Sequence, residues 1–192
     1  MINLKLKEYD KEIALIFAFF TMIFLFLMVF NSNFFTWAFE RHQNILSWYI
    51  RPLFLIPFCY FAYKRTWAGI SATIFFLFTS MFYFPTPEVV SQQSLQFLQV
   101  EKDYLTGDWG LAKIVFSLLV PISFIALGAA FWKRNLLFGI SVIVLMAVLK
   151  IIWSVAFGGQ AGMSIIIPAI VGLIICSVLI YFGFKRLEKN NN

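Results

Sequence analysis

Long apolar runs separated by short polar segments dominate the chain from residue 12 to residue 184. An α-helix needs about 20 residues to cross the hydrocarbon core of a bilayer, and six of these runs come close to that length. The six expected spans are Glu12–Phe30, Leu46–Tyr63, Trp67–Phe84, Leu111–Phe131, Leu136–Phe157 and Ala161–Phe184. The pattern therefore predicts an all-α polytopic membrane protein with six transmembrane helices, forming a single membrane-embedded domain over residues 1–192.

The longest polar segment, Pro85–Gly110, has a helical pattern of its own. Thr86, Pro87 and Glu88 predict a helix start, because a hydroxyl cap, a proline at the first helical position and an acid in the first turn all favour one. Gly107 predicts the end of that helix. Its apolar positions recur at helical spacing and are Val90, Phe97, Leu98, Tyr104 and Leu105. We expect an amphipathic helix that lies on the outer membrane surface or caps the bundle.

Composition agrees with an embedded protein. The chain is 61% hydrophobic and 12% charged, whereas soluble domains carry about 45–50% apolar and about 25% charged residues. The segment after the first span, residues 31–35, contains bulky side chains in place of a signal-peptidase site, so we expect this span to remain in the mature protein. The two cysteines, Cys59 and Cys176, fall within expected spans and are interpreted as small packing residues.

Lysine and arginine are distributed unevenly between the two sides of the expected spans. If the N-terminus lies inside, ten of the 15 basic residues fall in inside segments, which matches the bias of these residues toward the cytoplasm. The ten are Lys5, Lys7, Lys11, Lys64, Arg65, Lys133, Arg134, Lys185, Arg186 and Lys189. We therefore predict a plasma membrane protein with both termini in the cytoplasm. Because the basic residues occur in scattered pairs, the pattern excludes a nucleic-acid partner and favours contact with anionic lipid headgroups.

Two segments, residues 46–84 and 111–157, share a sequence pattern. In each, a proline is followed twelve residues later by a Lys-Arg pair with an aromatic residue directly before it. The matching positions are Pro52 and Pro121, Tyr63 and Trp132, Lys64-Arg65 and Lys133-Arg134, and, after a slip of one residue, Gly69-Ile70-Ser71 and Gly139-Ile140-Ser141. The pattern indicates a parallel duplication of one helical hairpin, which transporters use to build a site between their halves. Chance similarity between two apolar hairpins is the alternative.

Arg51 lies about five residues into the second span, or roughly 8 Å deep at 1.5 Å per residue. Pro52 follows it and is expected to move Arg51 away from helical geometry, and Pro57 weakens the same helix again. Irregular backbone at membrane depth occurs where it is buried in protein or faces water. Arg51 therefore either lines an outward-facing cavity or extends its side chain to the outer interface.

Lys150 lies deeper, roughly 10 Å from the outer surface. A lysine at the bilayer centre costs on the order of 2.5–3.5 kcal/mol, and somewhat less at this depth. No acid lies at the centre of a span, so its candidate partners are Glu40 and the acids of the outer segment, such as Glu101. Lys150 is therefore either part of a functional site or one half of a structural ion pair. Because Arg51 and Lys150 fall in the outer half of the bilayer, we expect them to share one outward-open region, over which the amphipathic helix is either a lid or a simple connection.

His42 is the only histidine. One histidine does not make a typical metal site, and it is either part of a site assisted by nearby acids or a solvated loop residue. The candidate ligand-binding residues are therefore Arg51, Lys150, His42, Glu40 and Glu101. We predict no catalytic residue, no metal ligand and no cofactor.

Three classes of function fit these patterns. The first two are a small membrane subunit or scaffold and a transporter with an outward-facing basic cavity for an anion or an anionic lipid. The alternative is a membrane enzyme that acts on a lipid at the outer face. The expected partners are the lipid bilayer and other membrane subunits or a second copy of the chain. A face of small residues in the sixth span allows a neighbouring helix to approach closely; it comprises Ser164, Pro168, Gly172 and Cys176.

Overall fold

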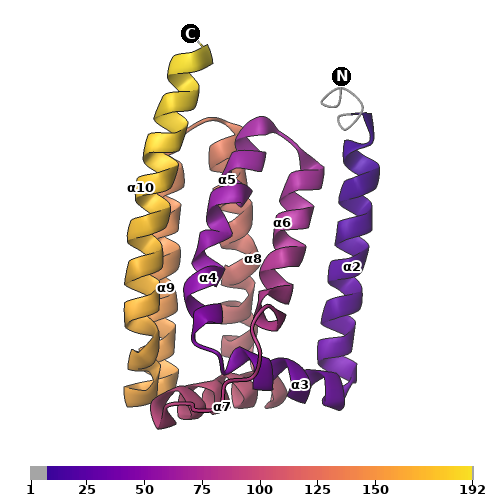
Figure 1. Ribbon diagram of the computed structural model, residues 1–192, viewed down its shortest axis with the longest axis vertical. Coiled ribbons are helices and arrows are strands. Elements are labelled where there is room, and N and C mark those ends of the chain that lie inside the picture. Colours follow the sequence, from indigo (N-terminus) through magenta and orange to yellow (C-terminus); the bar gives the residue numbers. More distant parts are fainter. Residues whose placement is uncertain (1–7, 192) are drawn as a thin grey trace. The chain divides into compact units, whose positions relative to one another are not determined.

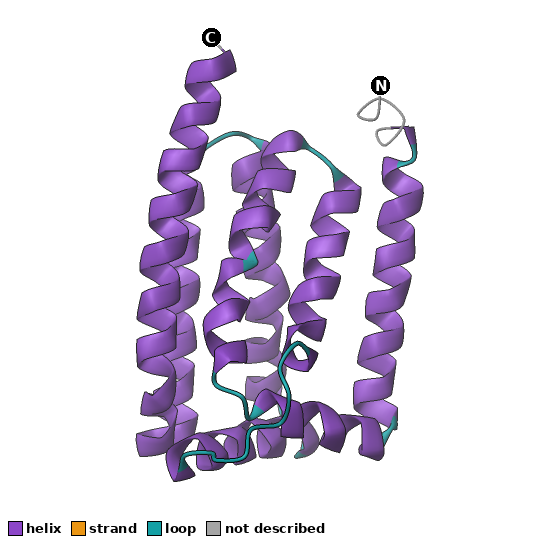
Figure 2. Ribbon diagram, viewed as in Figure 1, coloured by secondary structure: helices purple, strands orange, loops and turns teal. Residues whose placement is uncertain are grey.

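The computed structural model describes residues 8–191. All regular secondary structure in this range is helical, and the range contains no strand (Figures 1 and 2). The expected all-α class is confirmed. The chain divides into two compact units, Met1–Pro87 and Glu88–Asn192. Of the basic residues expected inside, Lys5 and Lys7 lie outside the described residues.

The first unit combines long helices with a helix that runs across them (Figure 1). Its described elements are α2 (Asp10–Phe30), α3 (Ser32–His42), α4 (Leu46–Leu53), α5 (Leu55–Lys64), α6 (Trp67–Thr79) and the 3₁₀ helix η1 (Ser80–Phe82). α3 lies across the end of α2, and α4–α5 forms a hairpin with α6. α2 packs along α6, where the rings of Phe17 and Phe75 have centroids 5.9 Å apart.

The chain turns sharply at both ends of α3. Asn31 adopts an extended conformation, and its side-chain oxygen accepts a hydrogen bond from the backbone N–H of Phe34 at 2.9 Å, which caps the start of α3. At its other end α3 meets the α4–α5 pair at an angle of 94°. The segment between the first two expected spans is therefore a helix rather than a loop.

The second expected span is two helices, and the break differs from the expected position. Arg51 remains helical within α4 although Pro52 follows it, so the expectation that the proline would displace it is wrong. The interruption falls at Phe54. Pro57 explains this position, because it lacks the N–H that would bond to the carbonyl of Leu53 in a continuous helix.

The second unit contains three long helices and one shorter helix across their end (Figure 1). Its described elements are α7 (Gln92–Thr106), α8 (Leu111–Trp132), α9 (Leu136–Gly162), the 3₁₀ helix η2 (Met163–Ile165) and α10 (Ile166–Asn191). α9 packs against α8 and α10, and α7 packs against α9.

Two glycines produce the reversal between α9 and α10. Gly159 has φ 52° and ψ −128°, a backbone conformation outside the helical region that residues with a side chain rarely adopt. Gly162 lies so close to the backbone of Ser154 that a Cβ atom there would overlap the Ser154 carbonyl. The chain can therefore fold back on itself within a few residues, and α10 returns alongside α9.

The turns after α5 and α8 have the same geometry. Arg65 has φ 57° and Arg134 has φ 58°, and these are the only non-glycine residues with positive φ between residues 8 and 191. In both turns the arginine N–H bonds to the carbonyl three residues back, Ala62 or Phe131, and the next N–H bonds to the carbonyl five residues back. After each turn a glycine, Gly69 or Gly139, leaves room for the ring of a phenylalanine in the preceding helix. The two turns are therefore alike in backbone and in packing.

Three described helical segments are long and apolar enough to cross a membrane: α2, α8 and Leu136–Leu187, which includes α9 and α10. A fourth is counted if α3 and α4–α5 form one bent span, and the apolar segment Trp67–Phe82 is shorter. The count differs from the six expected spans because α4–α5 is interrupted at Phe54, Trp67–Phe82 is short, and Leu136–Leu187, which folds back near Gly159, is counted as one segment.

The amphipathic helix begins later than expected. Thr86, Pro87 and Glu88 do not start a helix, and α7 begins at Gln92 after Ser91, whose side chain accepts a hydrogen bond from the backbone N–H of Ser94 at 3.1 Å. Each proline of the Pro85-Thr86-Pro87 sequence holds its preceding residue extended, which delays the helix. The expected end is confirmed, because α7 stops at Thr106 before Gly107. The helix has a buried face that includes Phe97 and Leu98.

Candidate functional site

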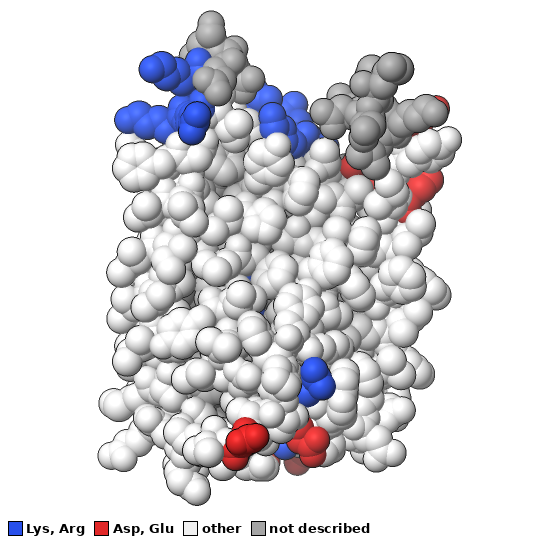
Figure 3. Space-filling view, in the orientation of Figure 1, with Lys and Arg blue, Asp and Glu red and all other residues white. Residues whose placement is uncertain are grey.

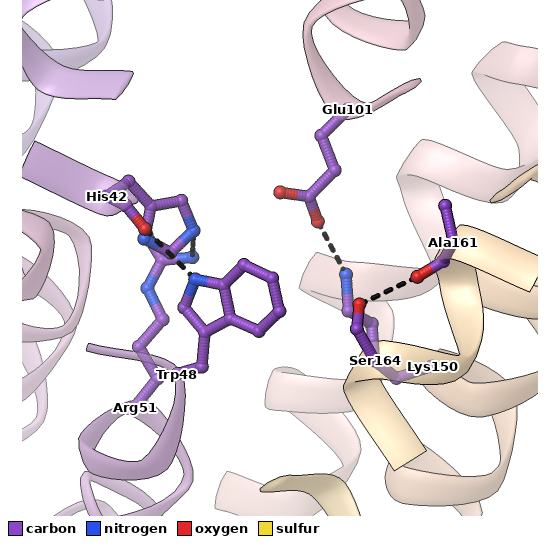
Figure 4. A network of polar contacts seen from close by, with 7 residues as sticks. All are labelled: His42, Trp48, Arg51, Glu101, Lys150, Ala161 and Ser164. Atoms are coloured by element: carbon purple, nitrogen blue, oxygen red, sulfur yellow. Dashed lines mark hydrogen bonds and ion pairs between the residues drawn. The ribbon is translucent and has the colours of Figure 1, made fainter. Parts of the chain in front are cut away.

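In the first unit, a cluster of polar groups surrounds the junction between α3 and α4. His42, the last residue of α3, is only 4% exposed. Its ring Nδ1 lies 2.9 Å from the Ser47 hydroxyl, and the indole Nε1 of Trp48 donates to the His42 carbonyl at 3.0 Å (Figure 4). The interpretation of His42 as a solvated loop residue is therefore wrong.

The hydrogen bonds around His42 favour one tautomer of its ring. The Ser47 hydroxyl donates its single proton to the Asn44 carbonyl at 2.7 Å, so it accepts from His42 Nδ1. The other ring nitrogen, Nε2, lies 3.2 Å from Nη1 of Arg51, and a guanidinium can only donate. These contacts fit the tautomer with its proton on Nδ1 and with the Nε2 lone pair facing Arg51.

Two arginines tie this junction to the end of α6. The Arg51 Nε donates to the Ser80 hydroxyl at 3.4 Å, and Ser80 donates to the Leu77 carbonyl at 2.6 Å. The Nε and Nη2 of Arg41 donate to the Phe82 carbonyl at 3.3 Å and 3.2 Å. Both guanidinium groups thus satisfy backbone or hydroxyl oxygens where α6 ends in η1, and they hold α3 and α4 against it.

The second unit contains a separate charged pair. Lys150 of α9 places its Nζ 2.9 Å from the Oε1 of Glu101 in α7 (Figure 4). The same ammonium lies 4.7 Å from the ring centroid of Trp153 and 5.5 Å from that of Phe97. A lysine over an aromatic face is attracted by the ring quadrupole. The charge of Lys150 is therefore balanced by a carboxylate and two aromatic rings.

Further contacts fasten α7 along α9 on both sides of this pair. Towards the start of α7, the Gln93 side-chain amide donates to the Gln160 carbonyl at 2.7 Å. Towards its end, the Tyr104 ring stands edge-on to Trp153 with centroids 5.0 Å apart, and its hydroxyl lies 3.1 Å from the carbonyl of Lys113 in α8. α7 is consequently a fixed part of the second unit.

Four of the five residues predicted as ligand-binding fall into two pairs, each within one unit. Arg51 and His42 are in direct contact in the first unit, and Lys150 and Glu101 are in direct contact in the second. Glu40 is exposed and belongs to neither group. That Arg51 and Lys150 share one region remains a prediction.

Several residues of both groups were missed in the sequence. Ser47 and Ser80 are common residue types whose role depends on the turn between α3 and α4 and on the end of α6, and no sequence signal indicates them. Trp153 could have been found, because it lies three residues after Lys150 and thus on the same helical face.

Comparison with models of protein families, with curated proteins and with solved structures gives no match to this chain. Among residues 8–191, no three His, Cys, Asp or Glu side chains lie close enough to hold a metal ion.

Proposed function

We propose that the chain is a six-span protein of the plasma membrane with both termini in the cytoplasm. The fold-back at Gly159 supports counting α9 and α10 as two spans, because the two helices pack side by side. α4–α5 counts as one span with a proline break, which membrane helices tolerate where neighbouring groups satisfy the freed carbonyls. The segment Trp67–Phe82 counts as a short one, about 24 Å long at 1.5 Å per residue, which a locally thinner bilayer accommodates.

Within this topology we propose a non-catalytic membrane subunit or scaffold that presents α7 on the outer face. The observation that carries this proposal is the Lys150–Glu101 pair. A lysine at membrane depth is expensive and by default indicates a functional site, but here its charge joins α7 to α9. The residue supports a structural role, and the exposed face of α7 is then the surface available to a partner.

A transporter for an anion is the second candidate. It is favoured by Arg51, which lies beside the break in α4–α5 and is held in place by His42 and Ser80. A lipid-modifying enzyme is supported least. Both ring nitrogens of His42 are engaged, one with Ser47 and one with Arg51, so the ring is poorly disposed to act as a general base.

Two experiments separate the scaffold from the transporter. A photo-crosslinking residue placed at Gln96, on the exposed face of α7, should trap a defined membrane partner or a second copy in native membranes. The doubly substituted variant Lys150→Met with Glu101→Gln should lose that product, because α7 is no longer fastened. Liposomes containing the wild-type chain should release chloride or phosphate no faster than empty ones. Steady anion release that falls on Arg51→Gln substitution would overturn the scaffold proposal in favour of the transporter.

We also propose that residues 46–84 and 111–157 arose by duplication. The proposal is supported by the matching turns at Arg65 and Arg134, which share φ and hydrogen bonding. In both hairpins the glycine that accommodates a phenylalanine ring follows that phenylalanine by the same number of residues, Phe61 to Gly69 and Phe131 to Gly139. A crosswise helix precedes each hairpin, α3 in one unit and α7 in the other. Exchange of residues 61–66 with 130–135, which aligns Arg65 with Arg134, tests this, because hairpins of common origin should accept each other's turn and still fold.

A further inference from the structure

The left-handed conformation of Arg65 and Arg134 is unexpected at a helix end. Glycine usually fills this position, because a Cβ atom is strained there. Both turns nevertheless place an arginine at it, each directly after a lysine. Backbone strain that is retained at a specific position indicates a role for the side chain. Here the side chain adds a positive charge to an exposed turn.

In the second unit this charge is part of a larger basic surface. The rings of Phe131 and Phe184 have centroids 4.9 Å apart, which brings the basic residues that follow Phe184 in α10 beside the turn after α8. Figure 3 shows lysine and arginine side chains gathered at this end of α10. The surface, named here the α8–α10 basic end, comprises Lys133, Arg134, Lys185 and Arg186, all of which are exposed.

Exposed apolar side chains lie close in sequence to the α8–α10 basic end. Leu137 is 78% exposed and Phe182 is 64% exposed, and each lies within four residues of a basic member. A phospholipid presents the same combination, with a charged phosphate at one end and hydrocarbon directly beyond it. A soluble anion would gain nothing from the apolar neighbours.

We propose that the α8–α10 basic end binds the phosphate headgroup of an anionic phospholipid, with an acyl chain along Leu137 and Phe182. The assignment to the cytoplasmic leaflet rests on the proposed topology, whereas headgroup binding itself does not. Each lysine or arginine near an anionic membrane surface contributes about a fivefold gain in affinity. An arginine at position 134 gives the site a charge that glycine, the residue which fits this turn without strain, would not supply.

The equivalent turn of the first unit provides a matched control. Lys64 and Arg65 have the same geometry, but the Asp10 carboxylate lies at this turn, bonded to the backbone N–H of Trp67 at 2.8 Å. A negative charge beside the basic pair weakens its attraction for another anion. We therefore expect the turn of the first unit to bind an anionic headgroup more weakly.

Thermal unfolding of the full chain in a neutral detergent tests the site. Added phosphatidylglycerol should raise the Tm, and phosphatidylcholine should not. Substitution of Lys133, Lys185 and Arg186 by glutamine should lower the apparent affinity for phosphatidylglycerol by about fivefold for each charge removed. Lys64→Gln should change it less. Equal effects of the two lipids on the wild-type chain, or equal losses at the two turns, would overturn the proposal.

Arg134→Gly tests the contribution of this side chain. The variant should bind phosphatidylglycerol with an apparent affinity about fivefold lower than the wild type, because it lacks one charge. Arg134→Lys keeps the charge and should keep the wild-type response. A full response of Arg134→Gly to phosphatidylglycerol would contradict the role assigned to Arg134. If the glutamine variants fail to fold, this pair of single variants decides the outcome.

Inorganic phosphate distinguishes a lipid site from a site for a soluble anion. At millimolar concentration it should leave the Tm unchanged in neutral detergent. A rise in Tm equal to that with phosphatidylglycerol would mean that the site binds a soluble anion rather than a lipid. Because these measurements are made in detergent, their failure would leave the proposed topology intact, and a reversed topology would leave the lipid affinity intact.

Discussion

The carboxylate of Asp10 caps a helix that starts at Trp67, far from it in sequence. Its two oxygens accept from the backbone N–H groups of Trp67 at 2.8 Å and Ala68 at 3.1 Å. These are among the first N–H groups of α6, which an α-helix does not bond to its own carbonyls. Asp10→Ala should lower the free energy of unfolding by roughly 0.5–2 kcal/mol, as loss of a helix cap does. Glu12→Ala, a nearby exposed acid, is the control. Equal losses in denaturant titrations of both variants would show that the cap has no specific effect.

The proposed topology predicts which residues an impermeant reagent reaches in intact cells. A single cysteine at Gln92, in a variant with Cys59 and Cys176 replaced by alanine, should be labelled without breaking the membrane. A cysteine at Asn135, in the turn between α8 and α9, should be labelled only after the membrane is opened. The reverse result would invert the orientation, because Gln92 adjoins Gln93, which bonds to Gln160 near the C-terminal end of α9, whereas Asn135 caps the N-terminal end of α9.

The Lys150–Glu101 pair should control how firmly α7 is attached. Lys150→Met and Glu101→Gln should each speed amide hydrogen exchange in α7, and a double-mutant cycle should give a coupling of roughly 0.5–1 kcal/mol. The value is small because 45% of the Lys150 side chain is exposed. Gln99→Ala removes a contact with Asp103 within α7 and should leave the attachment unchanged. Additive effects of the two charge substitutions would argue against the fastening role.

The fold-back between α9 and α10 should tolerate no side chain at Gly162. A Cβ atom there overlaps the Ser154 carbonyl, so Gly162→Ala should destabilise the protein by roughly 1–3 kcal/mol through overpacking. Gly183 lies within α10 and has open space around it, so Gly183→Ala should stabilise the protein by about 0.5–1 kcal/mol. Denaturant unfolding in detergent measures both. An unchanged free energy of unfolding in Gly162→Ala would mean that Gly162 does not pack as closely against Ser154 as described.

Part of this fold follows from hydrophobic pattern alone. The expected spans Glu12–Phe30 and Leu111–Phe131 nearly coincide with α2 and α8, because an uninterrupted apolar run has few alternatives to one long helix. The crosswise helix α3 was missed. It has only 11 residues, too few for a span, and it follows the first apolar run after a single residue, Asn31, whose side chain caps it. The break at Phe54 was missed as well. The distortion was expected at Arg51, directly before Pro52, whereas Pro57 explains the observed position.

For the candidate site, the expected depth of a residue in the membrane was informative, whereas most of its interaction partners could not be predicted from the sequence. A lysine within a span requires a balancing group, and the outer-segment acids include Glu101, its partner in the structure. The burial of His42 could not be predicted, because it depends on a turn that brings Ser47 and Trp48 of the next helix around the ring. Hydrogen bonds between neighbouring helices follow from where the chain turns, which hydrophobic periodicity does not report.

The long packing contact of α2 with α6 has a consequence for biosynthesis. α2 is made first, but the residues that pack along it, and the Trp67 N–H that Asp10 caps, come more than 50 residues later. At a synthesis rate of about 5–20 residues per second, α2 must wait several seconds for this partner. Its side chains suit that interval, because most of them still face outward in the folded unit. The first span can therefore enter the bilayer as an independent helix and later serve as the surface on which the rest of its unit assembles.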